Sequence, residues 1–283
     1  KNTITESAQT ENTSIKKSML ENSHQQQKEQ NDDKEYITVH QPGEKPKHAA
    51  IVLAAGKGER MQSRIPKQYM FVYDKPVLYY SLNAFQNNPN ISEIVLVTRQ
   101  QDIAYVKNKI VEKNNFTKVK KVISGGQERY DSVMQGLLNI EEADYVHIHD
   151  GARPMVNDEI INRCIQEVEK TGACVAGMPV KDTIKKVDNA QNVIETPERK
   201  TLWQVQTPQS FEKEMIKEAY LNVLEMAKDP SNNKLKQKIT DDAMILETYN
   251  GKKIKLIEGS YKNIKITTPE DIEIAELFLK TNK

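Results

Sequence analysis

The sequence is poor in cysteine and tryptophan and carries almost no net charge. It contains two cysteines, Cys164 and Cys174, and one tryptophan in 283 residues. Because the two cysteines form no CxxC pair, they favour neither a disulfide framework nor a structural zinc site, and they fit a reducing compartment. The 41 basic and 40 acidic residues give a net charge of +1. That balance argues against nucleic acid or an anionic membrane as a partner, so any anion site must be local.

Long apolar runs are missing too, since none approaches the roughly 20 residues that cross a bilayer. Residues 1–47 have a single aromatic residue, Tyr36, among many Gln, Asn, Glu and Lys. This composition cannot offset the entropy of ordering, so we expect a disordered tail before a domain over residues 48–283. The tail has neither the apolar segment of a secretory signal nor the arginines of a transit peptide. A cytoplasmic location is expected, or a plastid one if the tail is a transit remnant.

Short β-rich apolar runs alternate with helical patterns from Ala49 onward. In residues 157–170, the apolar side chains fall on one face of a 3.6-residue period, which predicts a helix. This alternation predicts an α/β fold, Rossmann-like, with a mostly parallel sheet flanked by helices. The expected strands are 49–55, 93–98, 119–124, 144–149 and 173–180.

Three further segments have local patterns of their own. Residues 179–204 alternate polar and apolar side chains around an Asn-rich turn, which predicts an extended β-hairpin that projects as an arm. Residues 225–238 are typical of a surface loop. Near the C-terminus, Thr268 is the expected N-cap of a final helix, with Pro269 at its first position and acidic residues in its first turn.

The stretch IVLAAGKGERMQSRIPKQY, residues 51–69, runs from a strand into a glycine loop. Gly56 and Gly58 let backbone N–H groups approach an anion closely. The stretch is not a Walker A motif, because the GxxxxGK[ST] spacing is absent. It is a poor dinucleotide fingerprint, because Met61 stands where the third glycine would be.

Several cations follow this glycine loop in a short space. Arg60, Arg64 and Lys67 lie within nine residues of Gly58. In an open α/β sheet, ligands bind beyond the carboxyl ends of the strands, where this loop is expected. Positive charges there suit a triphosphate, whose charge they neutralise while it reacts.

A carboxylate follows another predicted strand, in VHIHDGARP (146–154). Asp150 should lie at the same sheet edge, where a carboxylate facing a triphosphate is a natural Mg²⁺ ligand. Arg153 is within reach of the same site. His147 and His149 share one strand face, and we interpret them as packing residues because no third metal ligand is near them in sequence.

A second glycine turn occurs in SGGQERYDSV, residues 124–133, again after a predicted strand. Gly125 and Gly126 form the turn. Ser132 falls where a helix would begin, so its hydroxyl could touch a base or a ribose. A glycine turn after a strand is common, so this motif is weak when taken alone.

Taken in order, these segments resemble one family, the 2-C-methyl-D-erythritol 4-phosphate cytidylyltransferases of the non-mevalonate isoprenoid pathway. The resemblance covers residues 48 to 280 and implies a fold of the nucleotide-diphospho-sugar transferase type. The tail and the 225–238 segment are outside the compact pattern. The motifs that carry the resemblance are LAAGKGERMQSRIPKQ, GGQERYDSV, HDGARP, PVKDTIKKV, LWQVQTPQSF, ITDDA and NIKITTPEDIEIAE.

The resemblance implies transfer of CMP from CTP to 2-C-methyl-D-erythritol 4-phosphate, with release of pyrophosphate. By position, Arg60, Lys67 and Lys265 would be the catalytic cations, and Asp150 would hold Mg²⁺. The implied nucleotide-binding residues are Ala54, Ala55, Gly56, Gly58, Gly126 and Ser132, and those implied for the polyol phosphate are Arg153, Thr183, Arg199, Thr207, Thr240 and Asp241.

In the family the arm crosses to a second subunit, so the resemblance implies a homodimer in which Thr183 and Arg199 complete the neighbouring site. A ribitol-5-phosphate cytidylyltransferase is the nearest alternative, although its members tend to have LAGG where this chain has LAAG. A non-catalytic nucleotide-binding protein is a second alternative. The joint presence of Arg60, Lys67, Asp150 and Lys265 argues against it.

Overall fold

The computed structural model describes residues 44–56, 58, 61, 63, 65–229 and 239–281. The tail predicted over residues 1–47 lies almost entirely outside these ranges. The loop predicted over 225–238 also lies largely outside them, and its first two residues, Glu225 and Met226, belong to a helix.

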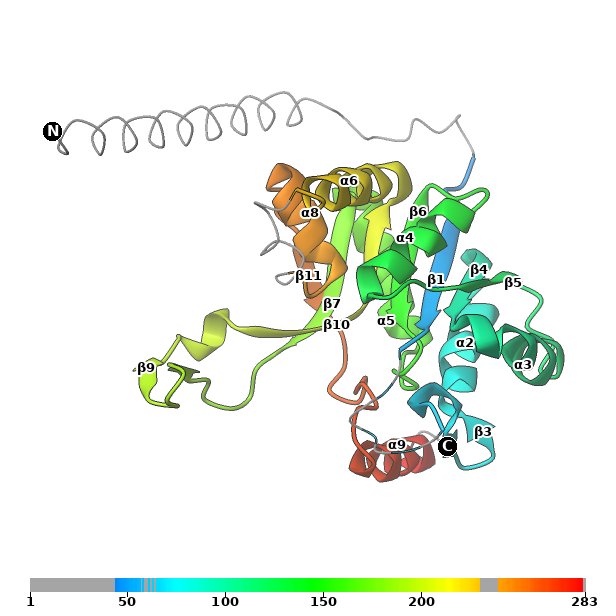
Figure 1. The fold of residues 1–283 in the computed structure, drawn as a ribbon, viewed down its shortest axis with the longest axis horizontal. Helices are drawn as coiled ribbons and strands as arrows, with labels where there is room; N and C mark the ends of the chain where they lie inside the picture. Colours follow the sequence, from blue (N-terminus) through cyan, green and yellow to red (C-terminus); the bar gives the residue numbers. More distant parts are fainter. Residues whose placement is uncertain are drawn as a thin grey trace, which may run out of the picture.

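A seven-stranded sheet forms the centre of the described chain (Figure 1), in the order β11-β7-β10-β6-β1-β4-β5. Strand β10 runs antiparallel to both its neighbours, and every other pairing in this sheet is parallel, which confirms a mostly parallel sheet. The strands are β1 (His48–Ala54), β4 (Ile91–Thr98), β5 (Val119–Ser124), β6 (Tyr145–Asp150), β7 (Ala173–Pro179), β10 (Trp203–Glu212) and β11 (Lys255–Glu258).

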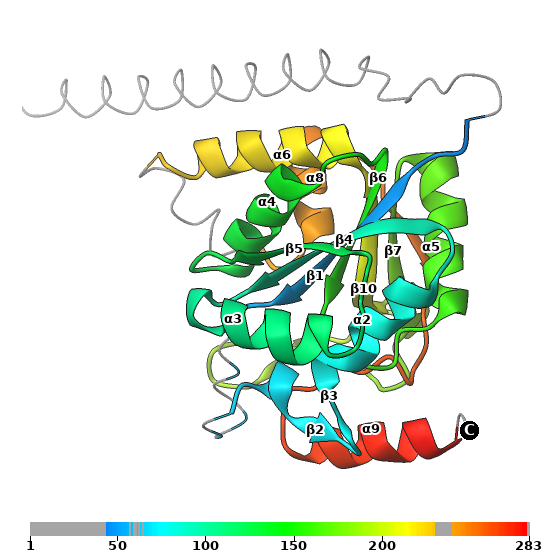
Figure 2. The same cartoon turned by 90° about the vertical axis from the view of Figure 1, so that its right-hand side faces the viewer.

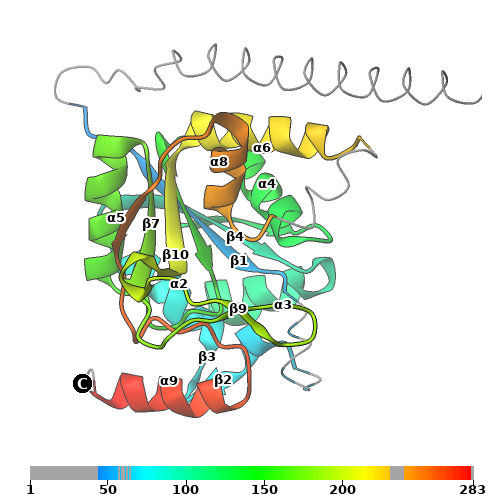
Figure 3. The same cartoon turned by 90° about the vertical axis from the view of Figure 1, so that its left-hand side faces the viewer.

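Helices cover both faces of the sheet (Figures 2 and 3), so its central strands are buried on both sides. In β1, Ala50 and Val52 face one apolar cluster while Ala49 and Ile51 face the other. The first cluster contains side chains of α2 (Val77–Asn87), α3 (Ile103–Val106), η4 (Lys107–Glu112) and α5 (Asp158–Thr171), and the second those of α4 (Arg129–Asn139), α6 (Lys213–Met226) and α8 (Asp242–Asn250).

Helix α5 matches its prediction within one residue at each end. Asn157 caps it by accepting a hydrogen bond from the backbone N–H of Ile160, at 3.1 Å. Gly172 ends it in the left-handed conformation, with φ of 74°, which glycine adopts at little cost. The helix therefore begins and ends where its terminal residues allow.

A small layer lies beyond the carboxyl ends of the parallel strands. It consists of the ribbon β2 (Phe71–Val72) and β3 (Lys75–Pro76), with helix α9 (Glu270–Thr281) packed on it. The Asp271 carboxylate accepts hydrogen bonds from the backbone N–H groups of Thr267 and Thr268, which fixes the start of α9. This layer holds the preceding segment, which contains Lys265, against the sheet edge.

The predicted arm projects from the sheet between β7 and β10 (Figure 1). Its strand pairing is shorter than the sequence alternation suggested, because beyond the pairing of Pro179 with Trp203 at its base only β8 (Lys186–Val187) and β9 (Val193–Glu195) form a ladder. The Asp188 carboxylate closes the turn by accepting from the backbone N–H groups of residues 190 and 192. A single 3-10 turn, η5 (Arg199–Thr201), leads back to β10.

Candidate active site

A cavity of about 1310 Å³ opens at the carboxyl ends of β1, β4, β5 and β6. Residues from both glycine loops, from the ends of these strands and from the segment before α9 line it. The cavity collects most of the site residues expected from sequence, namely Ala54, Ala55, Gly56, Gly58, Lys67, Gly126, Ser132, Asp150 and Lys265. Arg60 and Arg64 lie outside the described residues.

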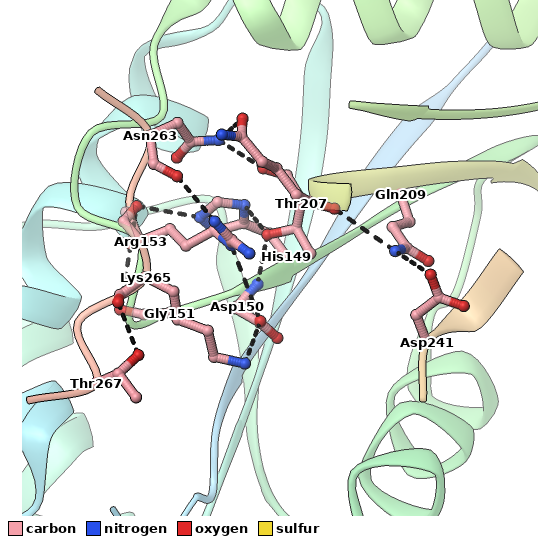
Figure 4. A network of polar contacts seen from close by, with 12 residues as sticks. His149, Asp150, Gly151, Arg153, Thr207, Gln209, Asp241, Asn263, Lys265 and Thr267 are labelled. Carbon is pink, nitrogen blue, oxygen red and sulfur yellow. Dashed lines mark hydrogen bonds and ion pairs between the residues drawn. The ribbon is translucent and has the colours of Figure 1, made fainter. Parts of the chain in front are cut away.

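Asp150, the last residue of β6, is surrounded by three cations, of which Figure 4 shows Lys265 and Arg153. Its Oδ2 lies 2.7 Å from Nζ of Lys265 and 4.0 Å from Nε of Arg153. Its Oδ1 accepts a 3.3 Å hydrogen bond from Nε of Arg129. Burial opposes ionisation, but Arg129, Lys265 and Arg153 together outweigh it and hold the pKa of Asp150 well below its usual value. The carboxylate is therefore charged at any physiological pH.

Arg129 is a site residue that the sequence reading missed. It is the first residue of α4 and lies inside the motif GGQERYDSV, but nothing local distinguished it from a solvated arginine. Its Nη1 and Nη2 each donate a 2.7 Å bond to one oxygen of Asp242, a side chain with no exposed surface. The ion pair therefore anchors the start of α8 to the cavity wall.

A short 3-10 helix, η2 (Lys67–Tyr69), packs against the first glycine loop and bonds its backbone. Gln68 donates hydrogen bonds to the carbonyl oxygens of Ala54 (2.7 Å) and Gly56 (3.3 Å). Gly58 has φ of 69°, and a Cβ there would lie 3.4 Å from the Lys67 side chain. Lys67 is thus held beside the loop, with the loop's carbonyl groups turned toward Gln68.

The second glycine turn needs its glycine because the start of α4 packs tightly against it. A Cβ on Gly126 would overlap the side chain of Asp131, which accepts from the backbone N–H of Glu128 to cap α4. The Gly126 N–H in turn donates to Oγ of Ser132, at 3.2 Å. The turn and the hydroxyl predicted to touch the nucleoside are therefore in contact.

The residues expected to bind the polyol phosphate are only partly brought together. Thr207 is buried, and its hydroxyl accepts from the backbone N–H of Asp150 (3.1 Å) and bonds Nδ1 of His149 (3.0 Å). Arg153 donates to the carbonyl oxygen of Asn263, while its buried Nε has no hydrogen-bond partner among the described residues. Arg153 and Thr207 therefore lie next to Asp150, although neither of them lines the cavity.

The other expected substrate residues lie farther away. Asp241 caps α8 and accepts from Gln209 at 3.2 Å, apart from the Asp150 cluster in Figure 4. The exposed Thr240 contacts Met244, four residues on. Thr183 and Arg199 are exposed on the arm, and Arg199 bonds the carbonyl of Lys181. None of these four lines the cavity.

His147 and His149 pack inside the sheet, as interpreted from sequence. His147 bonds Oγ of Ser210 (2.7 Å) and the ring of His48 (3.1 Å). Burial lowers the pKa of His149 to about 3, although the charge of Asp150 opposes that shift. Both rings are therefore neutral packing residues.

Asp150 suits Mg²⁺ as a lone protein ligand. No three His, Cys, Asp or Glu side chains of the described residues gather into a metal site. Mg²⁺ is commonly held by one or two carboxylates together with substrate phosphates. The ionised Asp150 meets that requirement in a cavity where a nucleotide would supply the remaining oxygens. No helix in the described ranges is long and apolar enough to cross a membrane.

Comparison with known proteins gives consistent results. Residues 48–281 match the sequence model of the family described as IspD, 2-C-methyl-D-erythritol 4-phosphate cytidylyltransferase. The chain is 54% identical to the enzyme of that name from Lachnospira eligens, over 82% of this chain and 99% of the relative. It is 46% identical to that from Lachnoclostridium phytofermentans, over 84% and 98%.

Solved structures agree in fold. A 4-diphosphocytidyl-2C-methyl-D-erythritol synthase from Anaerococcus prevotii superposes with a TM-score of 0.71 at 32% identity, covering 83% of this chain and 96% of that one. The 2-C-methyl-D-erythritol 4-phosphate cytidylyltransferase from Francisella tularensis gives a TM-score of 0.67 at 30% identity, covering 82% and 99%.

Proposed function

Because the chain belongs to the 2-C-methyl-D-erythritol 4-phosphate cytidylyltransferase family, we propose that its reaction takes place in the cavity around Asp150. The chain transfers CMP from CTP to 2-C-methyl-D-erythritol 4-phosphate, giving 4-diphosphocytidyl-2-C-methyl-D-erythritol and pyrophosphate. The family match does not favour the ribitol-5-phosphate alternative. The observation that supports this location is the meeting of both glycine loops, Lys67 and Lys265 around one ionised carboxylate.

The transfer is an in-line displacement between two anions. An oxygen of the substrate's phosphate attacks the α-phosphorus of CTP, and the bond to the bridging oxygen breaks as pyrophosphate leaves with its electron pair. Charge neutralisation and alignment therefore account for most of the catalysis. In this proposal, Lys67 and Lys265 stabilise the charge that develops on the transferring phosphoryl group. Arg60 is assigned the same task by its position in the motif.

The nucleotide is proposed to lie against the two glycine turns. Ala54 and Ala55 leave room for it, and the backbone N–H groups near Gly56 and Gly58 face its phosphates. At the start of α4, the helix N-terminus adds a favourable dipole for an anion. Gly126 and Ser132 would line the cytidine end.

Asp150 is proposed to hold Mg²⁺, which when bound would neutralise phosphate charge. Lys265 and Arg129 now contact the two carboxylate oxygens. The long side chain of Lys265 can turn toward the phosphates when a nucleotide is present, which frees Oδ2 for the ion, while Arg129 stays paired with Asp242. These side chains also keep Asp150 charged before the substrate arrives.

The second substrate is proposed to bind beyond Asp150, where Arg153 offers a buried Nε without a hydrogen-bond partner among the described residues. A phosphate oxygen would satisfy that donor. Thr207, Thr240 and Asp241 are assigned to the same substrate by their positions in the motifs, although none of them lines the cavity and Thr207 now supports the backbone of Asp150. Their contact with substrate stays a prediction, as does the cytoplasmic location.

A direct assay tests the proposed function. Purified protein should release pyrophosphate from CTP only when methylerythritol phosphate and Mg²⁺ are both present. Omission of either one serves as the control. Equal activity with ribitol 5-phosphate would move the assignment to the alternative substrate.

The arm is proposed to reach a second copy of the chain in a homodimer. It exposes four large apolar side chains, Ile184, Val187, Val193 and Ile194, at 39 to 60% of their surface. Exposed apolar residues gathered on a projecting element mark an interaction surface. Thr183 and Arg199 on the same arm would then complete the partner's site.

Mixing two inactive variants tests the shared site. We expect Lys67→Ala and Arg199→Ala to be inactive alone and to recover about a quarter of wild-type activity when co-expressed. Half of the randomly assembled dimers are mixed, and each of those has one intact site. Pyrophosphate release by the purified mixture measures this. No recovery in a mixture that sedimentation shows to contain mixed dimers would mean that each subunit builds its own site.

A further inference from the structure

One wall of the cavity is formed by a segment that none of the sequence motifs includes. Arg99, Gln100 and Gln101 follow directly after β4 and line the same cavity as Asp150. Arg99 carries the only charge of the three. The side chain is partly exposed, at 26%. It therefore faces the cavity while much of its length is covered.

Arg99 is held in a fixed orientation by its neighbours. Its Nε donates to Oδ2 of Asp102 at 2.6 Å, and its Nη2 donates to Oδ1 at 3.0 Å. Asp102 also accepts from the hydroxyl of Tyr69, at 3.1 Å, and that hydroxyl bonds Oγ1 of Thr98, at 2.6 Å. A paired guanidinium of this kind loses less entropy when it contacts a ligand.

Part of the guanidinium remains available to a ligand. Both bonds to Asp102 use Nε and Nη2, and Nη1 of Arg99 has no partner among the residues that the structure describes. Arginine nitrogens are donors only. Any ligand group that Arg99 contacts should therefore be an acceptor, such as a ring nitrogen, a carbonyl or a hydroxyl oxygen.

Strand order places Arg99 two strands away from Asp150 along the sheet edge. Asp150 ends β6, Ala54 ends β1, and Arg99 follows β4, so the three lie side by side along the sheet edge. Ser124, at the end of β5, lies one strand farther on. Neighbouring strands are about 4.8 Å apart, so β6 and β5 are separated by roughly 14 Å. A nucleotide with its phosphates at Asp150 would place its nucleoside near β4 and β5.

We propose that Arg99 is a nucleotide-binding residue that contacts the nucleoside end of CTP, with Asp102 and Tyr69 as its positioning residues. This inference rests on the proposed function, since it takes the triphosphate to lie at Asp150. Tyr69 belongs to η2, which also contains Lys67. The same short element therefore positions a cation at the reacting phosphate and a donor at the nucleoside.

Binding measurements with three probes test this assignment. We expect Arg99→Ala to weaken the binding of CTP and the binding of CMP by the same factor, about tenfold or more, because a hydrogen bond from a charged donor is lost. Binding of pyrophosphate should be unchanged. Isothermal titration of the wild type and the variant measures all three. Lys107→Ala, which removes an exposed charge from the neighbouring η4 outside the cavity wall, is the matched control and should change none of them.

The outcomes separate the alternatives. Weaker binding of pyrophosphate would place Arg99 at the phosphates, and unchanged binding of CMP would remove it from the nucleotide site; either result overturns the proposal. Failure of the wild type to bind CTP would instead refute the proposed function itself.

The positioning residues need a separate readout. Asp102→Asn and Tyr69→Phe should raise KM for CTP while leaving kcat and KM for methylerythritol phosphate near wild type. A purely structural role would change all three parameters together and would overturn this part of the proposal. Arg99→Lys should recover only part of the affinity, because lysine cannot keep the paired contact with Asp102.

Discussion

Replacement of Lys67 by alanine is expected to lower kcat by about 10²- to 10³-fold and to leave the fold intact. The magnitude is that of removing one fixed donor from a site where charge develops in the transition state. Lys67 lies beside Gly58 in η2, and Gln68 of the same short helix holds the glycine loop through hydrogen bonds to the carbonyl oxygens of Ala54 and Gly56. Steady-state pyrophosphate release measures the effect, and thermal unfolding checks the fold.

An exposed lysine on β5 provides the matched control. Lys120→Ala removes the same charge from an exposed side chain that donates to the carbonyl of Thr117, outside the cavity wall. Its kcat should equal that of the wild type. If Lys67→Ala turned over within a few-fold of the wild type, the first glycine loop would not be the catalytic loop.

The second large effect is expected at Asp242, a buried carboxylate whose loss should cost about 3 kcal/mol of unfolding free energy. Asp242→Asn leaves Arg129 with only its longer contact to Asp150 and weakens a buried contact with the hydroxyl of Tyr220, at 2.5 Å. Removing one partner of a buried pair costs about 3 to 5 kcal/mol. We take the lower value because the Arg129 side chain is 29% exposed and can relax toward the cavity.

The adjacent residue gives a control with the same chemistry. Asp241→Asn makes the same change at the N-cap of α8, where asparagine also caps well, so its stability should change little. Urea denaturation of both variants measures the difference. The double variant Arg129→Gln, Asp242→Asn should regain part of the lost unfolding free energy, because the positive charge of Arg129 is removed as well. Equal stabilities for Asp241→Asn and Asp242→Asn would show that the ion pair contributes nothing.

The cavity was predictable to a large extent because parallel strands bring their carboxyl ends to one sheet edge. Each of the three motifs around Gly56, Gly126 and Asp150 follows a strand, so the fold class alone required them to meet. Lys265 came from the family resemblance, since no strand pattern placed its segment. These predictions needed only the order of elements and the direction of the strands.

The missed residues depend on contacts between distant segments. Arg129 and Asp242 are 113 positions apart, and their pairing follows from how α4 and α8 pack on the same sheet face. Arg99 lies next to a predicted strand, but its role depends on Asp102 and on Tyr69 from another segment. A local sequence pattern cannot predict contacts between residues that are far apart in the sequence.

The arm shows a different limit. The alternation of polar and apolar residues over 179–204 predicted an extended hairpin, but it could not predict which residues form hydrogen-bonded strand pairs. Hydrogen bonding between β8 and β9 is confined to the tip. At the base of the arm, Pro179 pairs with Trp203 and the Val180 N–H donates to the carbonyl of Leu202, so pairing at the two ends leaves the middle of the arm without a ladder.

Strand β10 connects the arm to residues that support the site. Within ten residues it leaves the arm beside β7, carries Thr207 beneath Asp150, and carries Gln209, which bonds the backbone N–H groups that begin α8. One continuous strand therefore connects the base of the arm to the residue that supports the backbone of Asp150 and to the residue that fixes the start of α8.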